Sequence, residues 1–340
     1  MENINILAGD IGGTKTNLAV YNGHIGLDAP IAEATYPSKD YPSLEALVQE
    51  FMIQFQTEIH LASFGVAGPV ANGQATITNL PWVMDEKELA QRLGFNSVHL
   101  LNDLLAFAHA VPILEDKDVH VLNKGKLAAE GAKAVVAPGT GLGEAYLVWD
   151  GMAYRAFPSE GGHADFAPRT RLEAGLLRHL WNRYGHVSYE RVCSGTGLGR
   201  IYSYLKGKGF MQEKSWLANE LARAHDPAPV IVQGALDNKA PCEICRKTLD
   251  IFISILGAEA GNMALRLLAT GGVYLGGGIP PRIISALGQE GFIQAFQSKG
   301  RMSGILEDIP VCVIVNPKVA LLGAACHGLN TRRLQSGNTT

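Results

Sequence analysis

Three glycine-rich segments, each directly after a short apolar run, constrain most strongly how this chain can fold. They are GDIGGT at 9–14, PGTGLG at 138–143 and GGGIP at 276–280. A short apolar run predicts a buried strand, and glycine after it permits a tight turn whose backbone N–H groups approach a ligand closely. The pattern therefore predicts an α/β protein, and three such turns together indicate a nucleotide site.

The first two turns belong to a repeated unit. At 4–21 and at 135–149 a strand, a glycine turn and a second strand follow one another. The second strands end at Asn22-Gly23 and Asp150-Gly151, and aligning these dipeptides superimposes the glycine turns. The match indicates an internal duplication into two related halves, with a ligand between them. Asn-Gly after a strand also predicts a tight hairpin.

The remaining apolar patterns alternate between strand and helix. Ser43 precedes a run with the apolar spacing of a one-faced helix. Gly257 and Gly261 indicate close packing of a long helix, and the segments 115–133 and 206–241 are expected to be connectors and loops. The other expected elements are helices at 86–93, 242–268 and 319–327, the last closed by Gly328, strands at 62–66, 97–101, 273–275 and 311–315, and a polar tail from Asn330.

Composition excludes several classes of partner. The chain has 29 Lys and Arg against 32 Asp and Glu, so its net charge of -3 provides no basic field for nucleic acid or an anionic membrane. The apolar, uncharged stretch at 267–281 is too rich in glycine and proline for a membrane-spanning helix. The start, Met1-Glu2-Asn3, shows no export segment, and five cysteines are a sparse set. We therefore expect a cytoplasmic protein with small-molecule partners.

The first turn closely resembles a phosphate-binding P-loop. GDIGGTKT matches G-x-x-x-x-G-K-[ST] except that Thr14 replaces the second glycine. A P-loop opens a helix, whereas residues 17–21 alternate as a strand, which excludes this interpretation. A turn between strands can still hold phosphate through its N–H groups and the Thr14 hydroxyl, with Asp10 placed to hold magnesium through water. A plain tight hairpin is the alternative.

The other two turns strengthen the nucleotide interpretation. The second repeats the glycine and threonine pattern with Thr140, and two such turns suit a triphosphate. The third, Gly276–Gly278, follows a strand and precedes a helix, where missing side chains let a base or ribose approach the backbone. A simple helix-entry turn explains the third segment equally well.

Polar side chains with hydrogen-bonding capacity follow other strands. Asn102-Asp103 ends the strand at 97–101, the edge at which ligands bind in open α/β sheets, although a helix N-cap is the commoner role of such a pair. The loop Glu160-Gly161-Gly162-His163, with Asp165 beyond it, suits sugar recognition, a metal site or a solvated loop. Glu190 on its own would be assigned to a solvated surface.

Together these motifs resemble the bacterial glucokinase family, within the hexokinase and actin-like ATPase superfamily. The resemblance covers nearly the whole chain, and the motifs stand in the family's order. They are GDIGGT (9–14), TNLPW (78–82), LLND (100–103), GTGLG (139–143), EGGHADFAP (160–168), GHVSYERVCSGTGL (185–198) and GGVYLGGGIPPR (271–282).

The resemblance implies ATP-dependent phosphorylation of glucose at the 6-hydroxyl, giving glucose 6-phosphate and ADP. Asp103 is then the general base and contacts the sugar, Asn102, Glu160, His163 and Glu190 bind the other hydroxyls, and Asp10 positions Mg²⁺ through water. The implied ATP-binding residues are Gly9, Asp10, Ile11, Gly12, Gly13, Thr14, Gly139, Thr140, Gly141, Gly276, Gly277 and Gly278. Phosphoryl transfer needs alignment, charge neutralisation and a nearby carboxylate, which agrees with this set.

The resemblance also implies the fold. It is a two-domain ribonuclease-H-like (actin-like ATPase) α/β fold, in which each domain is a mixed sheet flanked by helices and the active site lies in the interdomain cleft. We expect a small domain at 1–113 plus 317–340, with the C-terminal helix returning to it, and a large domain at 114–316. The family also suggests a homodimer.

Two residues depart from the family's pattern, and alternatives stay open. Glu144 follows GTGLG where an apolar residue is common, and Thr196 replaces a common proline. A kinase for another hexose or amino sugar is a close alternative, although that group carries clustered zinc-binding cysteines and this chain has only Cys242 and Cys245 nearby. A non-catalytic sugar-sensing regulator and an actin-like assembly protein are others, and the donor is ATP or polyphosphate.

Overall fold

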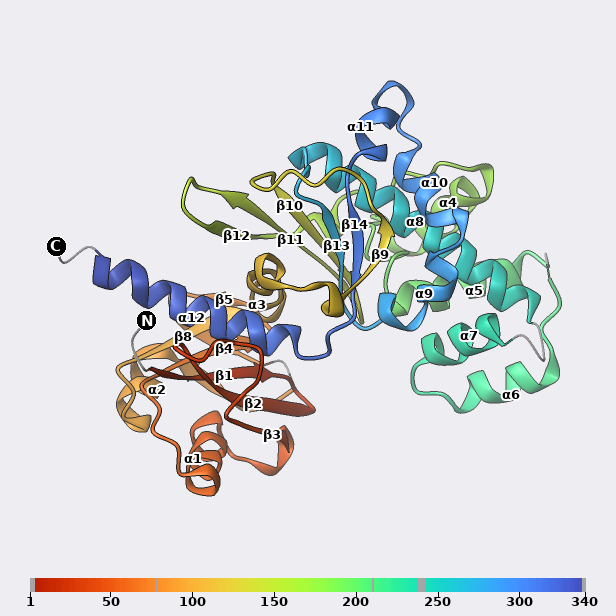
Figure 1. Ribbon diagram of the computed structural model, residues 1–340. Helices are drawn as coiled ribbons and strands as arrows, with labels where there is room; N and C mark the ends of the chain where they lie inside the picture. Colours follow the sequence, from red (N-terminus) through yellow and green to blue (C-terminus); the bar gives the residue numbers. More distant parts are fainter. Residues whose placement is uncertain (1–3, 78, 210, 238–241, 338–340) are drawn as a thin grey trace. The chain divides into compact units, whose positions relative to one another are not determined.

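The computed structural model describes residues 4–77, 79–209, 211–237 and 242–337. The chain divides into two compact units, whose elements are labelled in Figure 1. Unit 1 comprises 1–114 and 316–340, and unit 2 comprises 115–315. Some residues named in the sequence predictions lie outside the described residues. They are the ends of the chain at 1–3 and 338–340, Thr78 of the TNLPW motif, and residues 238–241 of the predicted loop region.

Unit 1 is built on a five-stranded mixed sheet in the order β3-β2-β1-β4-β8. β1 to β3 pair antiparallel, whereas β1, β4 and β8 run parallel. The strands are β1 (Asn5–Ile11), β2 (Lys15–Asn22), β3 (Ala32–Pro37), β4 (Leu61–Val66) and β8 (Ser97–Asn102), with a small separate sheet of β5 (Val70–Ala71), β6 (Gln74–Thr76) and β7 (Val83–Asp85). The helices are α1 (Leu44–Phe55), α2 (Glu86–Leu93), α3 (Asp103–Ala110) and α12 (Val319–Gly337).

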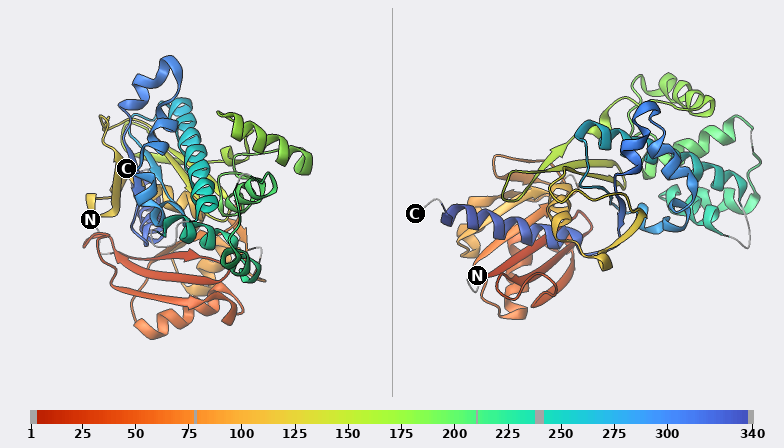
Figure 2. Two further views of the ribbon diagram at one scale, coloured as in Figure 1. Left: turned by 90° about the vertical axis from the view of Figure 1, so that its right-hand side faces the viewer. Right: turned by 45° about the horizontal axis from the view of Figure 1, so that its top comes forward.

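The two faces of this sheet are covered by different helices. Leu7 of β1 packs in a cluster with Phe51 of α1, whereas Ile6 packs with Leu321 of α12. Successive side chains of a strand point to opposite faces, so a strand covered on both faces is apolar throughout. Figures 1 and 2 show α1 and α12 on opposite sides of the sheet.

Unit 2 repeats this topology in a sheet of order β12-β11-β10-β13-β14-β9. β10 to β12 pair antiparallel, β10, β13 and β14 run parallel, and β9 adds an antiparallel edge. The strands are β9 (Val119–Asn123), β10 (Lys133–Pro138), β11 (Leu142–Trp149), β12 (Tyr154–Ser159), β13 (Val273–Leu275) and β14 (Val311–Ile314). Apart from β9, order and directions match those of unit 1, so the predicted duplication is confirmed in topology.

The helices of unit 2 pack around α8 (Glu243–Leu267). A Cβ at Gly257 or Gly261 would overlap the carbonyl oxygen of Phe292 or Phe296 in α10, so the predicted close helix packing is confirmed. The other helices are α4 (Arg171–Tyr184), α5 (Gly195–Gly207), α6 (Ser215–Arg223), α7 (Pro227–Leu236), α9 (Ile284–Leu287), α10 (Glu290–Gln297) and α11 (Ser303–Glu307).

Among the described helices, α8 alone is long and apolar enough to cross a membrane by length and composition. Within unit 2, however, 78% of its most apolar window is buried. It packs against α5, α7 and α10 (Figure 1). These contacts are those of the core helix of a globular unit, whose apolar side chains are covered by protein.

Two local predictions in unit 1 are wrong. Asn22-Gly23 does not form a two-residue hairpin, because β3 begins only at Ala32 and the Asn22 side chain accepts the N–H groups of His24 (2.9 Å) and Ile25 (3.1 Å) instead. Gly328 does not end the last helix, since α12 continues to Gly337. A Cβ at Gly328 would overlap Ile6, so this glycine permits close packing of α12 on the sheet.

Two predicted connectors also contain regular structure. The segment 115–133 includes β9, an edge strand of the second sheet. The segment 206–241 includes α6 and α7, and α7 begins after Asp226, whose side chain accepts the Ala228 N–H at 3.0 Å, with Pro227 in its first turn. The Asp-Pro pair is a helix-start signal that the sequence carried.

We predict that Gly323→Ala destabilises unit 1. A Cβ there would overlap the Ala106 carbonyl oxygen, so α12 must move away from α3, the helix that begins at Asp103. The expected loss is about 1–3 kcal/mol in the free energy of unfolding, measured by urea denaturation. The control is Gly291→Ala on α10, where no atom lies within 4 Å and a small gain is expected. A loss in the control as large as that in Gly323→Ala would contradict the account.

Candidate active site

In unit 1, polar residues gather where parallel strands end. Asp10 is in register with Gly65 of β4, which is in register with Leu101 of β8, directly before Asn102-Asp103. Parallel strands bring their carboxyl ends to one edge of a sheet, the edge at which ligands bind in this class of fold. The structure therefore brings together the predicted residues Asp10, Asn102 and Asp103.

Asn102 and Asp103 form the start of α3. The Asn102 Oδ1 accepts the Leu104 N–H at 3.0 Å, and its Nδ2 donates to the Gly68 carbonyl at 3.1 Å. Asp103 Oδ1 accepts the same N–H at 2.8 Å. The N-cap interpretation is thus correct for Asn102, and this cap fixes the position of the Asp103 carboxylate.

Gly65 allows α3 to begin close to the sheet. A Cβ on Gly65 would lie 2.8 Å from the Ala106 Cβ and 3.7 Å from the Asp103 Cα. Any larger residue would push the first turn of α3 away from β4, and Asp103 with it. The position of the carboxylate therefore depends on a glycine that stands apart from the three glycine-rich turns.

Burial dominates the electrostatics of both carboxylates. It raises the pKa of Asp103; the Leu104 hydrogen bond opposes this shift, and the Asp10 carboxylate adds to it. Burial also raises the pKa of Asp10, against a hydrogen bond from Asn17 (3.1 Å) and the charge of Lys15. A carboxylate with a raised pKa is a stronger base than an exposed one.

The first glycine turn joins β1 and β2, as predicted, rather than opening a helix. Gly12 N–H donates to the Lys15 carbonyl at 3.1 Å, and the buried Ser38 hydroxyl donates to the Gly12 carbonyl at 2.6 Å. Thr14 is exposed, and its carbonyl accepts the Ser38 N–H at 3.1 Å. These bonds fix the turn and leave the Thr14 side chain facing solvent. The strand after the turn confirms that a P-loop is absent here.

In unit 2 the second and third glycine turns lie against each other. A Cβ on Gly277, whose φ is +76°, would lie 2.6 Å from the Pro138 carbonyl oxygen, and Ile279 N–H donates to that oxygen at 3.3 Å. The Gly139 carbonyl accepts the Gly195 N–H at 2.7 Å, which ties the second turn to the start of α5. Only glycine combines this φ with this approach.

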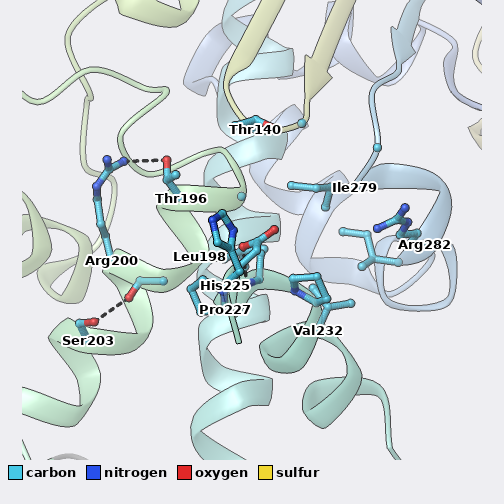
Figure 3. Close-up of a pocket in the computed structure, with 18 of the residues that line it drawn as sticks. Thr140, Thr196, Leu198, Arg200, Ser203, His225, Pro227, Val232, Ile279 and Arg282 are labelled. Atoms are coloured by element: carbon cyan, nitrogen blue, oxygen red, sulfur yellow. Dashed lines mark hydrogen bonds between the residues drawn. The ribbon is translucent and has the colours of Figure 1, made fainter. Parts of the chain in front are cut away.

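A pocket of about 860 Å³ opens beside these turns (Figure 3). Thr140 and Gly278 come from the turns, Thr196 and Leu198 from α5, and Val232 from α7. The N-terminus of α5 borders the pocket, and such a terminus favours anions. Further lining comes from His225 to Pro229, Ile279 and Arg282. The mixture of apolar walls, basic side chains and hydroxyls suits a nucleotide.

Glu190 lies beside the second turn rather than on a solvated surface. Its Oε2 accepts the Leu142 N–H at 3.0 Å, and its own N–H donates to the Gly162 carbonyl at 2.8 Å. A Cβ on Gly141 would lie against the same carboxylate oxygen. Glu190 therefore connects the glycine turn at 139–141 with the loop that carries Glu160 and His163.

Glu160 and His163 are exposed at the ends of a short 3₁₀ turn, with 3.7 Å between His163 Nε2 and Glu160 Oε2. Asp165 does not join them, because it pairs with His186 at 2.9 Å. Within the described ranges, no three His, Cys, Asp or Glu side chains are grouped as they would be to hold a metal ion. Among the described residues, Glu160, His163 and Asp165 therefore do not converge as the metal alternative would require, and their exposed side chains leave the sugar and solvated-loop interpretations open.

Sequence reasoning missed part of the pocket. It assigned no role to the start of α5, where the buried Ser194 hydroxyl accepts the Gly197 N–H at 3.1 Å and donates to the Glu190 carbonyl at 2.7 Å. Ser194 ahead of glycines is an N-cap signal that identifies this helix start. His225 carries no local signal, because it reaches the pocket from a distant segment, whereas Arg282 ends the motif that contains the third glycine turn and was assigned no role.

Comparison with known proteins places these motifs in context. The family model described as Glucokinase matches residues 7–331. The glucokinase of Nostoc punctiforme is 41% identical over 335 residues, which cover 94% of this chain and 97% of the relative.

Solved structures agree in fold. A crystal structure of a glucokinase from an Antarctic psychrotroph is 33% identical, with a TM-score of 0.84 over 97% of this chain and all of the other. A ROK family glucokinase from Streptomyces griseus, solved in complex with glucose and AMPPNP, is 17% identical, with a TM-score of 0.64 over 96% of this chain and 99% of the other. At that identity the second structure supports the fold alone.

We predict that Asn102→Ala lowers the free energy of unfolding by about 1 kcal/mol, because two hydrogen bonds of Asn102 are lost, the one that its Oδ1 accepts from Leu104 N–H and the one that its Nδ2 donates to the Gly68 carbonyl, although Asp103 Oδ1 still accepts the Leu104 N–H. Asn102→Asp keeps the cap acceptor and should retain most of the stability. Urea denaturation of both variants measures the difference. Equal losses in the two variants would contradict the capping role.

Proposed function

The chain belongs to the glucokinase family and phosphorylates glucose, and from this premise we propose the details of the reaction. ATP donates the phosphoryl group to the glucose 6-hydroxyl, and Asp103 is the general base. The observation that carries the proposal is a half-buried carboxylate, fixed at a helix start beside Asp10, in the family's LLND motif.

Asp103 has the properties that a general base for a sugar hydroxyl requires. Burial, and after it the Asp10 charge, raise its pKa, which strengthens it as a base. Its hydrogen bond to Leu104 N–H occupies Oδ1 and holds the carboxyl in place. In phosphoryl transfer, alignment of the nucleophile contributes more than covalent chemistry, so a fixed carboxylate is the useful feature.

We propose that the other sugar hydroxyls bind Asn102, Glu160, His163 and Glu190. Carboxylate, amide and imidazole groups exchange hydrogen bonds with hydroxyls, and a site built this way rejects analogues that lack a hydroxyl. Glu160 and His163 are exposed and able to accept a ligand, while Glu190 keeps one carboxylate oxygen beyond the one bonded to Leu142 N–H.

We propose that ATP uses the glycine turns and the unit 2 pocket. The phosphates meet the backbone N–H groups and hydroxyls of the first turn, Gly9, Asp10, Ile11, Gly12, Gly13 and Thr14, and of the second, Gly139, Thr140 and Gly141. The adenosine enters the 860 Å³ pocket along Gly276, Gly277 and Gly278. Support comes from the pocket's size and basic lining and from the AMPPNP bound to the Streptomyces griseus protein.

Asp10 fits a magnesium ion. Its carboxylate is half-buried at the sheet edge and receives one hydrogen bond, from Asn17, and hard oxygen ligands suit Mg²⁺. Mg²⁺ bound there through water would neutralise phosphate charge. Cytoplasmic location and a homodimer stay predictions from the sequence and the family.

The substrate assignment is tested by ADP release with glucose, mannose, fructose, glucosamine and N-acetylglucosamine, and by replacing ATP with polyphosphate. We expect the highest kcat/KM with glucose and ATP. A higher value with an amino sugar would identify a kinase of the alternative group. Sugar binding without turnover under all conditions would favour a regulator.

We predict that Asp103→Asn lowers kcat by about 10²–10⁴-fold, because the amide cannot accept the hydroxyl proton. Glucose affinity, measured by equilibrium binding, should change far less. The control is Asp28→Asn, an exposed carboxylate of the same unit. Unchanged turnover in the folded Asp103 variant would rule out its role as base.

We predict that Gly278→Leu raises KM for ATP by about tenfold, roughly 1.4 kcal/mol, and leaves KM for glucose unchanged. A Cβ at Gly278 meets no atom within 4 Å, so the fold tolerates the side chain, which enters the pocket. Gly291→Leu on α10, where the surroundings are equally open, is the control. An unchanged KM for ATP would place the nucleotide elsewhere.

A further inference from the structure

Glu144, which departs from the family's pattern, is fully buried in unit 2. Among the described residues, neither of its carboxylate oxygens has a hydrogen-bond partner. An ionised carboxylate in such surroundings is strongly unfavourable, so the group is expected to hold its proton. Burial, with the nearby Glu259 carboxylate as the second cause, raises the pKa of Glu144 to about 8.

Glu259 of α8 is the second fully buried carboxylate, and its surroundings differ. Its oxygens accept hydrogen bonds from Arg266 Nη1 and Asn262 Nδ2, both at 2.8 Å. Hydrogen-bond donors and a cation stabilise the ionised form of Glu259, and the Glu144 carboxyl has no such donors among the described residues. Burial raises the pKa of Glu259 as well, but these donors and the Arg266 cation oppose that shift. Of this interacting pair, Glu144 is therefore the carboxyl group that holds a proton more strongly.

Glu144 lies directly beneath the loop of Glu160 and His163. In the sheet it stands opposite Ser159, the last residue of β12. A Cβ on Gly161 would overlap Glu144 Oε2, and one on Gly162 would overlap the Leu142 carbonyl oxygen. The Gly161-Gly162 backbone thus rests on β11, and the Glu144 carboxyl is part of the surface that supports it.

We propose that protonated Glu144 is a positioning residue for sugar binding, which supports the Gly161-Gly162 turn between Glu160 and His163, and that glucose affinity falls when this proton is lost. The proposal rests on the proposed function, in which that loop binds glucose. An unpaired charge beneath Gly161 must move toward water or draw water in, and either change displaces the turn.

Other ionisable groups surround Glu144, so the assignment needs a variant. From α8, Glu259 and Arg266 act on it, and the buried Cys193 thiol also lies within reach of its charge. Lys299, whose Nζ donates to Asn262 Oδ1 at 2.5 Å, belongs to the same network, and burial lowers its pKa to about 8. An alkaline change in the unaltered protein alone therefore does not distinguish Glu144 from Lys299.

Glu144→Gln makes that distinction, since it keeps the size and cannot ionise. Glucose Kd is measured by equilibrium binding on the full chain from about pH 6.5 to about pH 9.5, on either side of the Glu144 pKa. In the unaltered protein we expect Kd to rise by about fivefold or more with pH. The control variant Glu220→Gln, on the exposed face of α6, should show the same rise in glucose Kd. In Glu144→Gln, glucose Kd should change little with pH. The proposal is overturned if glucose Kd of the unaltered protein does not change with pH. It is also overturned if glucose Kd of Glu144→Gln rises as much as that of the unaltered protein.

Two further readouts are independent of sugar binding. The infrared carbonyl band of a protonated carboxylic acid should be present at neutral pH and absent in Glu144→Gln; its persistence there would assign the proton to Glu259 instead.

The unfolded state loses this proton near pH 4.5 and the folded state near pH 8, so rising pH in that window favours unfolding. The stability advantage of Glu144→Gln should therefore grow across the window, and a constant difference contradicts the assignment.

The sugar role of the loop is tested separately by Glu160→Gln. If that variant binds glucose normally, the proposed function of the loop fails. The infrared and stability results for Glu144 would be unaffected, so failure of the proposed function and failure of the protonation assignment are distinguishable. If Glu160→Gln weakens binding while Glu144→Gln does not alter the pH dependence, the positioning role alone fails.

Discussion

The parallel pairing of β1 with β4 and of β4 with β8 is the constraint on which the site in unit 1 depends. It places Asp10 and Asp103 at one sheet edge, close enough for one carboxylate to raise the pKa of the other. The same pairing in unit 2, of β10 with β13, places the second glycine turn against the third. One topology, used twice, accounts for the position of the proposed base in one unit and of the proposed nucleotide pocket in the other.

Close approach of backbone is the second requirement, and glycine meets it at particular points. Gly65 admits the first turn of α3, Gly277 admits the Pro138 carbonyl, and Gly161 admits a buried carboxyl group. At each point a Cβ would displace a functional segment rather than only reduce packing. Close packing also removes the carboxyl groups of Asp103 and Glu144 from water, and this burial raises their pKa values.

The sequence predicted features whose cause is local. The glycine turns, the Ser43 cap and the close packing at Gly257 and Gly261 depend on neighbouring residues or simple periodicity, and the structure has them. The motif order identified the family. Tertiary packing, which no local pattern records, determines the contact of Glu190 with Leu142, the burial of Glu144 and the position of His225 at the pocket. Edge strand β9 was missed because its exposed residues lack a buried strand's apolar run.

The central claim is that the glucose 6-hydroxyl is delivered to Asp103 while ATP occupies the glycine turns. A crystal structure with glucose and a non-hydrolysable ATP analogue tests it most directly. We expect the sugar 6-oxygen within about 2.6–3.2 Å of an Asp103 carboxylate oxygen, with the adenosine in the unit 2 pocket. A sugar whose 6-hydroxyl faces a different acidic residue, or a nucleotide bound outside that pocket, would contradict it.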